Sequence, residues 1–250
     1  MTLGLATDWL YEFDAFSLHH LVLTVVCVWV TWIVIRYART VRGTRDEFRV
    51  RVAWALMTLL GEIGSTIVWT LPARYSREAS WPIHLCDYAA WLAPFALLLP
   101  LRWPKTLLFF WGIGLSTQGF LTPTVSQGVL SAEYWVFWIQ HLGVVGGGFY
   151  LAAVNGYRPA LRDLGLTIAV TFALVCFMVW FNIQADTNYM YLGSSLPDKP
   201  TILDALGDYP GRLVWIVLLG ILGFKLTYLG SESVHRLRGR ALRADPPSHH

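Results

Sequence analysis

The segment from Trp81 to Asp87 carries three groups that could do chemistry, the imidazole of His84, the thiol of Cys86 and the carboxyl group of Asp87. The apolar run 88–101 follows at once, so these groups are expected at the mouth of a membrane helix. Ionisable side chains in a membrane cost about 2.5–3.5 kcal/mol on insertion scales and usually have a function. A thiol beside a histidine is typical of a nucleophile whose proton the imidazole removes, which makes this segment a candidate catalytic site.

The base for the thiol is expected to come from another helix. His84 and Cys86 are two residues apart, so on a helix they point to opposite sides, whereas His84 and Asp87 share a face. His141 lies inside a later apolar run and could reach Cys86 from across the bundle. We therefore predict a catalytic Cys86–His141 pair, oriented by Asp87 or His84. It stays open that Cys86 and His141 serve packing and structural hydrogen bonds alone.

Further polar residues are predicted to line the same site. Gln118 and Thr122 could donate hydrogen bonds to a developing oxyanion. The long segment 184–211 is predicted to fold back as a lid whose donors, and the cation Lys199, hold a lipid phosphate. The expected substrate-binding residues are Gln118, Thr122, Asn182, Asn188, Tyr189, Tyr191, Lys199 and Glu62.

Metal binding ranks third among the options for this site, because no compact motif such as His-Glu-x-x-His is present. The possible ligands would be His84, Asp87, His141 and Glu62. The three cysteines lie far apart, in separate apolar runs, without the spacing of a zinc site or a disulfide framework. We therefore predict no metal and no cofactor.

The elements that must position these residues are membrane helices. The chain is 55% hydrophobic and only 14% charged, against about 25% charged in ordinary soluble domains. A spanning helix needs about 20 apolar residues, and open strands cannot cross lipid. Seven runs qualify, 16–37, 50–72, 83–101, 105–124, 134–154, 162–183 and 212–229. The predicted fold is an all-α bundle of seven transmembrane helices in one domain, 1–230, followed by a basic tail, 231–250.

The orientation of this bundle follows from its basic residues. All but four of the 19 Lys and Arg residues fall on one side of the predicted spans, the exceptions being Arg74, Arg77, Lys199 and Arg212. Basic loops stay in the cytoplasm, which places the N-terminus outside and the C-terminus inside. The membrane polar groups then share a depth in the outer half of the bilayer. A bacterial inner membrane is expected, and the net charge of +3 is too small to indicate nucleic-acid binding.

Four stretches of the chain together carry a family resemblance. They are Pro82-Ile83-His84-Leu85-Cys86-Asp87, Phe110-Trp111-Gly112 leading to Gln118-Gly119-Phe120-Leu121-Thr122-Pro123, Phe137-Trp138-Ile139-Gln140-His141, and Asn188-Tyr189-Met190-Tyr191-Leu192 before Lys199-Pro200. In this order they resemble the YwaF-like integral membrane proteins, whose animal relative is called transmembrane protein 164. Thr124 departs from the family pattern, which has an acidic residue after Leu-Thr-Pro.

The resemblance implies movement of fatty acyl chains between phospholipids, with the cysteine of the His-Leu-Cys stretch, here Cys86, as nucleophile. The predicted function is therefore a membrane-embedded lipid acyltransferase or transacylase that acts on phospholipid and lysophospholipid. One alternative is a non-catalytic lipid- or small-molecule-binding protein or a transporter. A further alternative is a membrane acyl-ester hydrolase, since the family is also similar to androgen-induced membrane hydrolases.

Overall fold

A computed structural model of the protein describes residues 8–77, 80–194 and 205–244, and it confirms an all-helical fold over these ranges. Five of the described helices are long and apolar enough to cross a membrane. They are α2 (Leu18–Thr40), α3 (Arg45–Thr70), α7 (Ala132–Ala153), α8 (Leu161–Ala185) and α9 (Gly211–Ala244). The helix α9 continues past residue 230, so the start of the predicted tail is helical.

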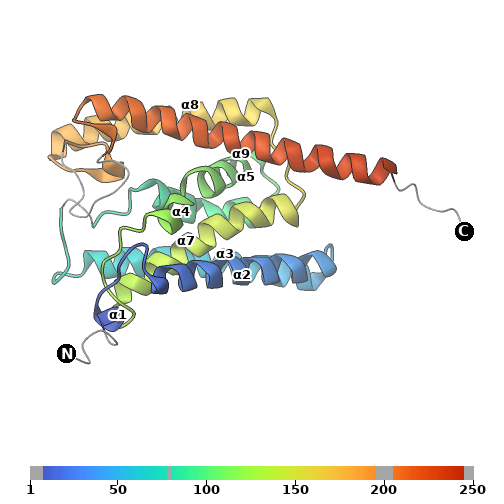
Figure 1. Ribbon diagram of the computed structural model, residues 1–250, viewed down its shortest axis with the longest axis horizontal. Helices are drawn as coiled ribbons and strands as arrows, with labels where there is room; N and C mark the ends of the chain where they lie inside the picture. Colours follow the sequence, from blue (N-terminus) through green and yellow to red (C-terminus); the bar gives the residue numbers. More distant parts are fainter. Residues whose placement is uncertain (1–7, 78–79, 195–204, 245–250) are drawn as a thin grey trace, which may run out of the picture.

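The long helices lie along one axis of the molecule, and consecutive ones run in opposite directions (Figure 1). The connections therefore gather at two ends. We call one the polar end; it holds the short helix α1 (Asp8–Tyr11) and segments 71–77, 80–84, 122–131 and 186–194. The other, the basic end, holds segments 41–44, 99–101 and 154–160.

The run 83–101 forms a shorter helix than expected, α4 (Leu85–Leu98), of 14 residues. Its N-cap is His84, and the backbone N–H of His84 donates to Asp87 Oδ2 at 2.7 Å. This carboxylate cap starts the helix at Leu85. Ser80, which precedes this helix, does not cap it; its hydroxyl accepts from the backbone N–H of Ser76 at 2.8 Å.

The run 105–124 is not one continuous α-helix. It is divided into α5 (Arg102–Phe109), a π-helix η2 (Phe110–Leu115) and α6 (Gln118–Leu121). Close packing accounts for the small residues here, since a methyl group added at Gly112 would lie 2.6 Å from the carbonyl oxygen of Val144 in α7. The wider π-turn changes the direction of the side chains that follow it, and π-turns recur at functional sites.

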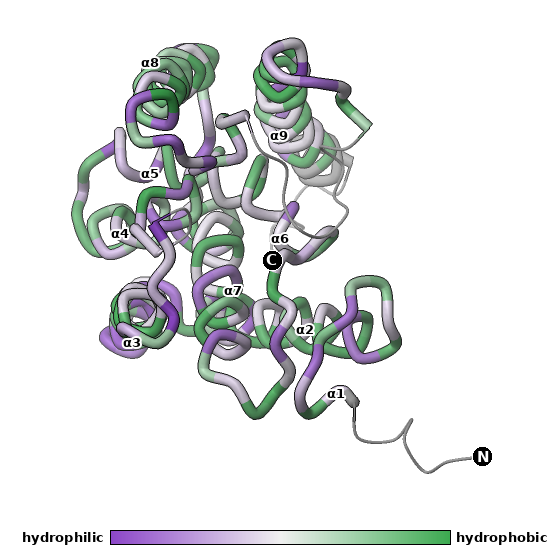
Figure 2. Tube along the Cα trace, turned by 90° about the vertical axis from the view of Figure 1, so that its left-hand side faces the viewer, coloured by the Kyte–Doolittle hydropathy of each residue, from purple (hydrophilic) through white to green (hydrophobic). Residues whose placement is uncertain are grey.

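Helix α7 is the central element of the bundle, as the end-on view shows (Figure 2). It packs against α2, α3, α4, α5 and η2. Glycines permit this approach, because methyl groups at Gly143 and Gly146 would collide with Thr58 and Trp54 of α3. By contrast α2, α8 and α9 expose most of their apolar side chains, as expected for helices that face lipid. The fold thus surrounds the polar residues of α7 with other helices.

Candidate functional site

Two buried carboxyl groups meet at the amide of Gln140. Glu62 comes from α3, Asp87 from α4 and Gln140 from α7, and all three side chains are buried. The Gln140 Nε2 group donates to Asp87 Oδ1 at 2.8 Å and also to Glu62 Oε2. Thr66 Oγ1 donates to the other oxygen of Glu62 at 3.3 Å. A buried polar network of this kind fixes three helices relative to one another.

His84 connects this network to the segment after α8. Its backbone is held by Asp87, and its Nδ1 accepts from the backbone N–H of Met190 at 3.3 Å. The imidazole also packs on the rings of Tyr189 and Tyr191, with centroids 5.4 Å and 6.0 Å away. The contact of His84 with Asp87 is thus a backbone helix cap, and their shared role in orienting Cys86 stays a prediction.

The thiol of Cys86 contacts a serine that follows the π-helix. Cys86 Sγ donates to Ser116 Oγ at 3.6 Å, and the serine is buried. The backbone N–H of Ser116 donates to the carbonyl of Trp111 at 2.8 Å, a five-residue step typical of the π-turn. Asp87 and Glu62 both act electrostatically on Cys86. The π-turn therefore brings a hydroxyl, not an imidazole, to the thiol.

His141 lies in the same region with a defined tautomer. Its Nδ1 bonds the carbonyl oxygen of Phe137 at 2.8 Å. Because a carbonyl only accepts, Nδ1 carries a proton, and in the neutral ring Nε2 keeps the lone pair. Nε2 faces Gly119, where an added methyl group would lie 2.5 Å from it. Among the described residues no hydrogen bond joins His141 to Cys86, so the predicted pair stays a prediction.

Asn182 folds the segment after α8 back over the polar end. Its Oδ1 accepts from Thr187 Oγ1 and from the backbone N–H of Tyr189, both at 2.9 Å, and its Nδ2 donates to the carbonyl of Tyr189 at 2.9 Å. The buried hydroxyl of Tyr189 accepts from the backbone N–H of Trp81 at 3.1 Å and donates to the carbonyl of Arg77 at 2.8 Å. This segment therefore covers the start of α4.

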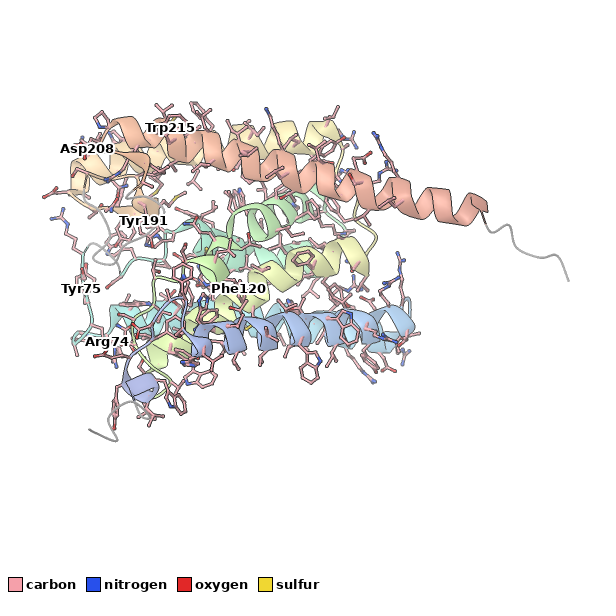
Figure 3. The ribbon with its side chains drawn as sticks, in the orientation of Figure 1. Arg74, Tyr75, Phe120, Tyr191, Asp208 and Trp215 are labelled. Atoms are coloured by element: carbon pink, nitrogen blue, oxygen red, sulfur yellow. The ribbon has the colours of Figure 1, made fainter. Side chains whose placement is uncertain are left out.

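Tyr191 and Asn188 complete the described part of this cover. Figure 3 shows Tyr191 at the polar end, near the ends of several helices. Burial raises the pKa of Tyr191, whose hydroxyl lies close to Thr124. The Oδ1 of Asn188 accepts from the backbone N–H of Gly193 at 2.8 Å. The predicted cation Lys199 lies outside the described residues.

The two predicted oxyanion donors differ in placement. Gln118 is exposed at the start of α6, and its side chain makes no hydrogen bond within the described chain. The hydroxyl of Thr122 is buried and has no partner among the described residues. Across the same residues no three His, Cys, Asp or Glu side chains are arranged to hold a metal ion. Thr122 is thus the better placed of the two donors.

Sequence reasoning missed two members of the site, Gln140 and Ser116. A signal for Gln140 was present, because an amide inside the apolar run 134–154 must find partners in a membrane. The sequence signal for Ser116 was weaker, because a hydroxyl in a membrane helix commonly bonds the backbone one turn earlier and so needs no partner on another helix. Only the π-turn directs Ser116 towards Cys86.

The helices and the buried network of Glu62, Asp87 and Gln140 define a polytopic helical membrane protein. The chain belongs to the TMEM164 family, whose model matches residues 15–228. This confirms the resemblance to relatives of transmembrane protein 164. No curated protein and no solved structure matched the chain.

Proposed function

We propose that the protein is a membrane-embedded lipid acyltransferase or transacylase with Cys86 as the acyl-accepting residue. The observation that carries the proposal is the convergence on Cys86 of polar groups from separate elements. Ser116 contacts its sulfur, and the neighbouring residue Asp87 is joined through Gln140 of α7 to Glu62 of α3. Polar groups held together at membrane depth are expensive and usually functional.

The reaction begins with loss of the thiol proton from Cys86. His141 is proposed as the base, because its Nε2 carries the lone pair and has no partner among the described residues. The sulfur attacks the acyl carbonyl of a phospholipid, a C–S bond forms, and the ester C–O bond breaks. His141 returns the proton to the leaving alkoxide, which departs as lysophospholipid. Thr122 is proposed to donate to the oxyanion of the tetrahedral intermediate.

The second half-reaction regenerates the thiol. The hydroxyl of another lysophospholipid loses its proton to His141 and attacks the thioester carbonyl. A new ester C–O bond forms as the C–S bond breaks, and the sulfur regains the proton from His141. Because no hydrogen bond joins the two residues in this structure, Cys86 and His141 must come together when lipid binds. Apo sites commonly tighten in this way.

The membrane setting of this reaction is part of the proposal. We propose seven membrane crossings, the five long helices plus α4 and the α5–η2–α6 segment. The polar end faces outwards and the basic end the cytoplasm, in a bacterial inner membrane. The segment 184–211 acts as a lid, with Asn188, Tyr191 and Lys199 at the lipid headgroup and Tyr189 as its buried anchor. The described part supports this, since Tyr189 is buried against His84.

The test is acyl transfer by purified protein supplied with labelled phospholipid and lysophospholipid. Cys86→Ser should abolish thioester formation, and His141→Ala should slow transfer about a hundredfold or more. Cys176→Ser is the matched control, because Cys176 is exposed on α8 and should be dispensable. Equal acyl movement by wild type, Cys86→Ser and His141→Ala would rule out the mechanism. Release of free fatty acid without a lysophospholipid acceptor would favour the hydrolase.

One observation favours a second candidate, a binding protein or transporter without covalent chemistry. The hydrogen-bond partner of Cys86 is a neutral hydroxyl, whereas the two carboxyl groups share one amide, as in a site for a polar ligand. Intact mass spectrometry discriminates the two. An acyl adduct on Cys86 supports the enzyme, and a noncovalent lipid with an unmodified thiol supports binding.

A further inference from the structure

A cleft of about 230 Å³ opens at the basic end, far from the site just described. It lies where the α4–α5 connection meets the α7–α8 loop, and its lining residues are Pro100, Arg102, Lys105, Asn155 and Tyr157. Exposed Leu99, Leu101 and Trp103 lie beside it. Tryptophan next to basic residues is typical of the membrane interface, so the cleft is at the height of lipid headgroups.

Part of the positive charge at this cleft is already neutralised. Arg102 Nε donates to Asp163 Oδ1 at 3.0 Å, and Arg102 Nη2 donates to the carbonyl of Arg158 at 3.1 Å. Its guanidinium also lies over the ring of Tyr157, 5.4 Å from the centroid. Burial raises the pKa of Tyr157 to about 12, so its hydroxyl stays neutral. These contacts hold Arg102 rigidly in the cleft wall.

The remaining positive charge has no counter-ion in the described chain. Lys105 makes no ion pair among the described residues and lies within the electrostatic reach of Arg51. Arg42 is likewise without a carboxylate partner there, and a methyl group at Gly156 would lie 3.0 Å from its Nη2. Asn155 also lines the cleft, and its side-chain amide makes no hydrogen bond within the described chain. Arg51 is itself paired with Glu47. Lys105 and Arg42 have no such carboxylate partner among the described residues, and each would attract an anion at this end.

We propose that this cleft binds the phosphate of an anionic phospholipid in the leaflet at the basic end. Lys105 and Arg42 would contact the phosphate oxygens, Asn155 would donate through its amide, and the acyl chains would lie along the exposed leucines. Basic pockets between membrane helices on the cytoplasmic side are a known mode of headgroup recognition. The proposal is independent of acyl transfer, because the two sites are at opposite ends of the bundle.

The test is native mass spectrometry of the full chain titrated with phosphatidylglycerol, with phosphatidylcholine, and with inorganic phosphate as competitor. Wild type should prefer phosphatidylglycerol, and Lys105→Gln should weaken that binding about tenfold, the loss of one charge-assisted contact. Lys105→Arg should retain binding, which separates loss of charge from misfolding. Arg236→Gln, which removes an exposed cation from α9, is the matched control and should bind as wild type does.

Each other outcome overturns the assignment. Equal affinity for the two lipids would show that the cleft does not select an anionic headgroup. Equal losses in Lys105→Gln and Arg236→Gln would show that Lys105 does not bind the lipid in the cleft. Displacement of phosphatidylglycerol by inorganic phosphate, with the same dependence on Lys105, would assign the cleft to free phosphate in place of lipid.

Discussion

Gln140 is the residue on which the polar end depends most, because one amide serves two buried carboxyl groups. Buried polar groups are inexpensive only while they are hydrogen-bonded. Removing the shared donor would leave Glu62 and Asp87 each without one partner. The stability of the polar end therefore rests on a residue that takes no part in the proposed reaction.

We expect Gln140→Leu to lower the free energy of unfolding by about 1–3 kcal/mol, the cost of leaving buried acceptors unsatisfied. Equilibrium unfolding in mixed micelles measures this change. Gln184→Leu is the matched control, because Gln184 is exposed near the end of α8. Its effect should stay within about 0.5 kcal/mol. Equal effects of the two substitutions would show that the bridge contributes nothing to stability.

At the scale of the element, the segment after α8 depends on one buried side chain. Asn182 makes three hydrogen bonds to residues 187–189, and Tyr189 then contacts the segment before α4. Segments with few such contacts open readily. The lid proposed here is therefore held at its N-terminal side by Asn182.

Asn182→Ala should release this segment, because it removes all three side-chain hydrogen bonds. We expect amide hydrogen exchange at Tyr189 and Trp81 to become at least about tenfold faster, equivalent to roughly 1.4 kcal/mol of local stability. Gln184→Ala, two residues along the same helix and exposed, should leave exchange unchanged. Unaltered protection of Tyr189 in Asn182→Ala would mean that the segment is held by other contacts.

At the scale of the whole molecule, the two ends of the bundle differ in charge and in polar content. The orientation proposed here puts the basic end in the cytoplasm. It decides in which leaflet each of the two proposed lipid sites lies. Arg42 and Ser194 are exposed residues at opposite ends, and each can be replaced by cysteine. Labelling of the introduced cysteines by a thiol reagent therefore shows which end of the bundle faces the outside.

In a version that lacks Cys27, Cys86 and Cys176, Arg42→Cys should resist a membrane-impermeant thiol reagent in intact cells. Ser194→Cys should react, because it lies at the polar end. Permeabilised cells provide the control, since both cysteines should then be labelled. The reverse pattern in intact cells would invert the orientation and move the proposed acyl-transfer site to the inner leaflet.

The helical membrane class and the gathering of polar groups at one end were predictable from sequence. Both depend on local properties, because the hydropathy of a run indicates a spanning helix and residue number gives depth at about 1.5 Å per residue. His84, Cys86, Asp87 and His141 were singled out for this reason, and their catalytic roles stay predictions; the TMEM164 family match covers the part of the chain that contains them.

The partners of these residues were decided by tertiary structure. Ser116 reaches Cys86 because a π-turn changes the direction of the chain after Leu115, and Gln140 reaches two carboxyl groups because glycines bring α7 close to α3. Which side chains on different helices form hydrogen bonds depends on the angle at which the helices cross and on their register. The hydropathy of a run of residues carries no information about either. The contact of the Ser116 hydroxyl with the Cys86 thiol is the consequence of that difference.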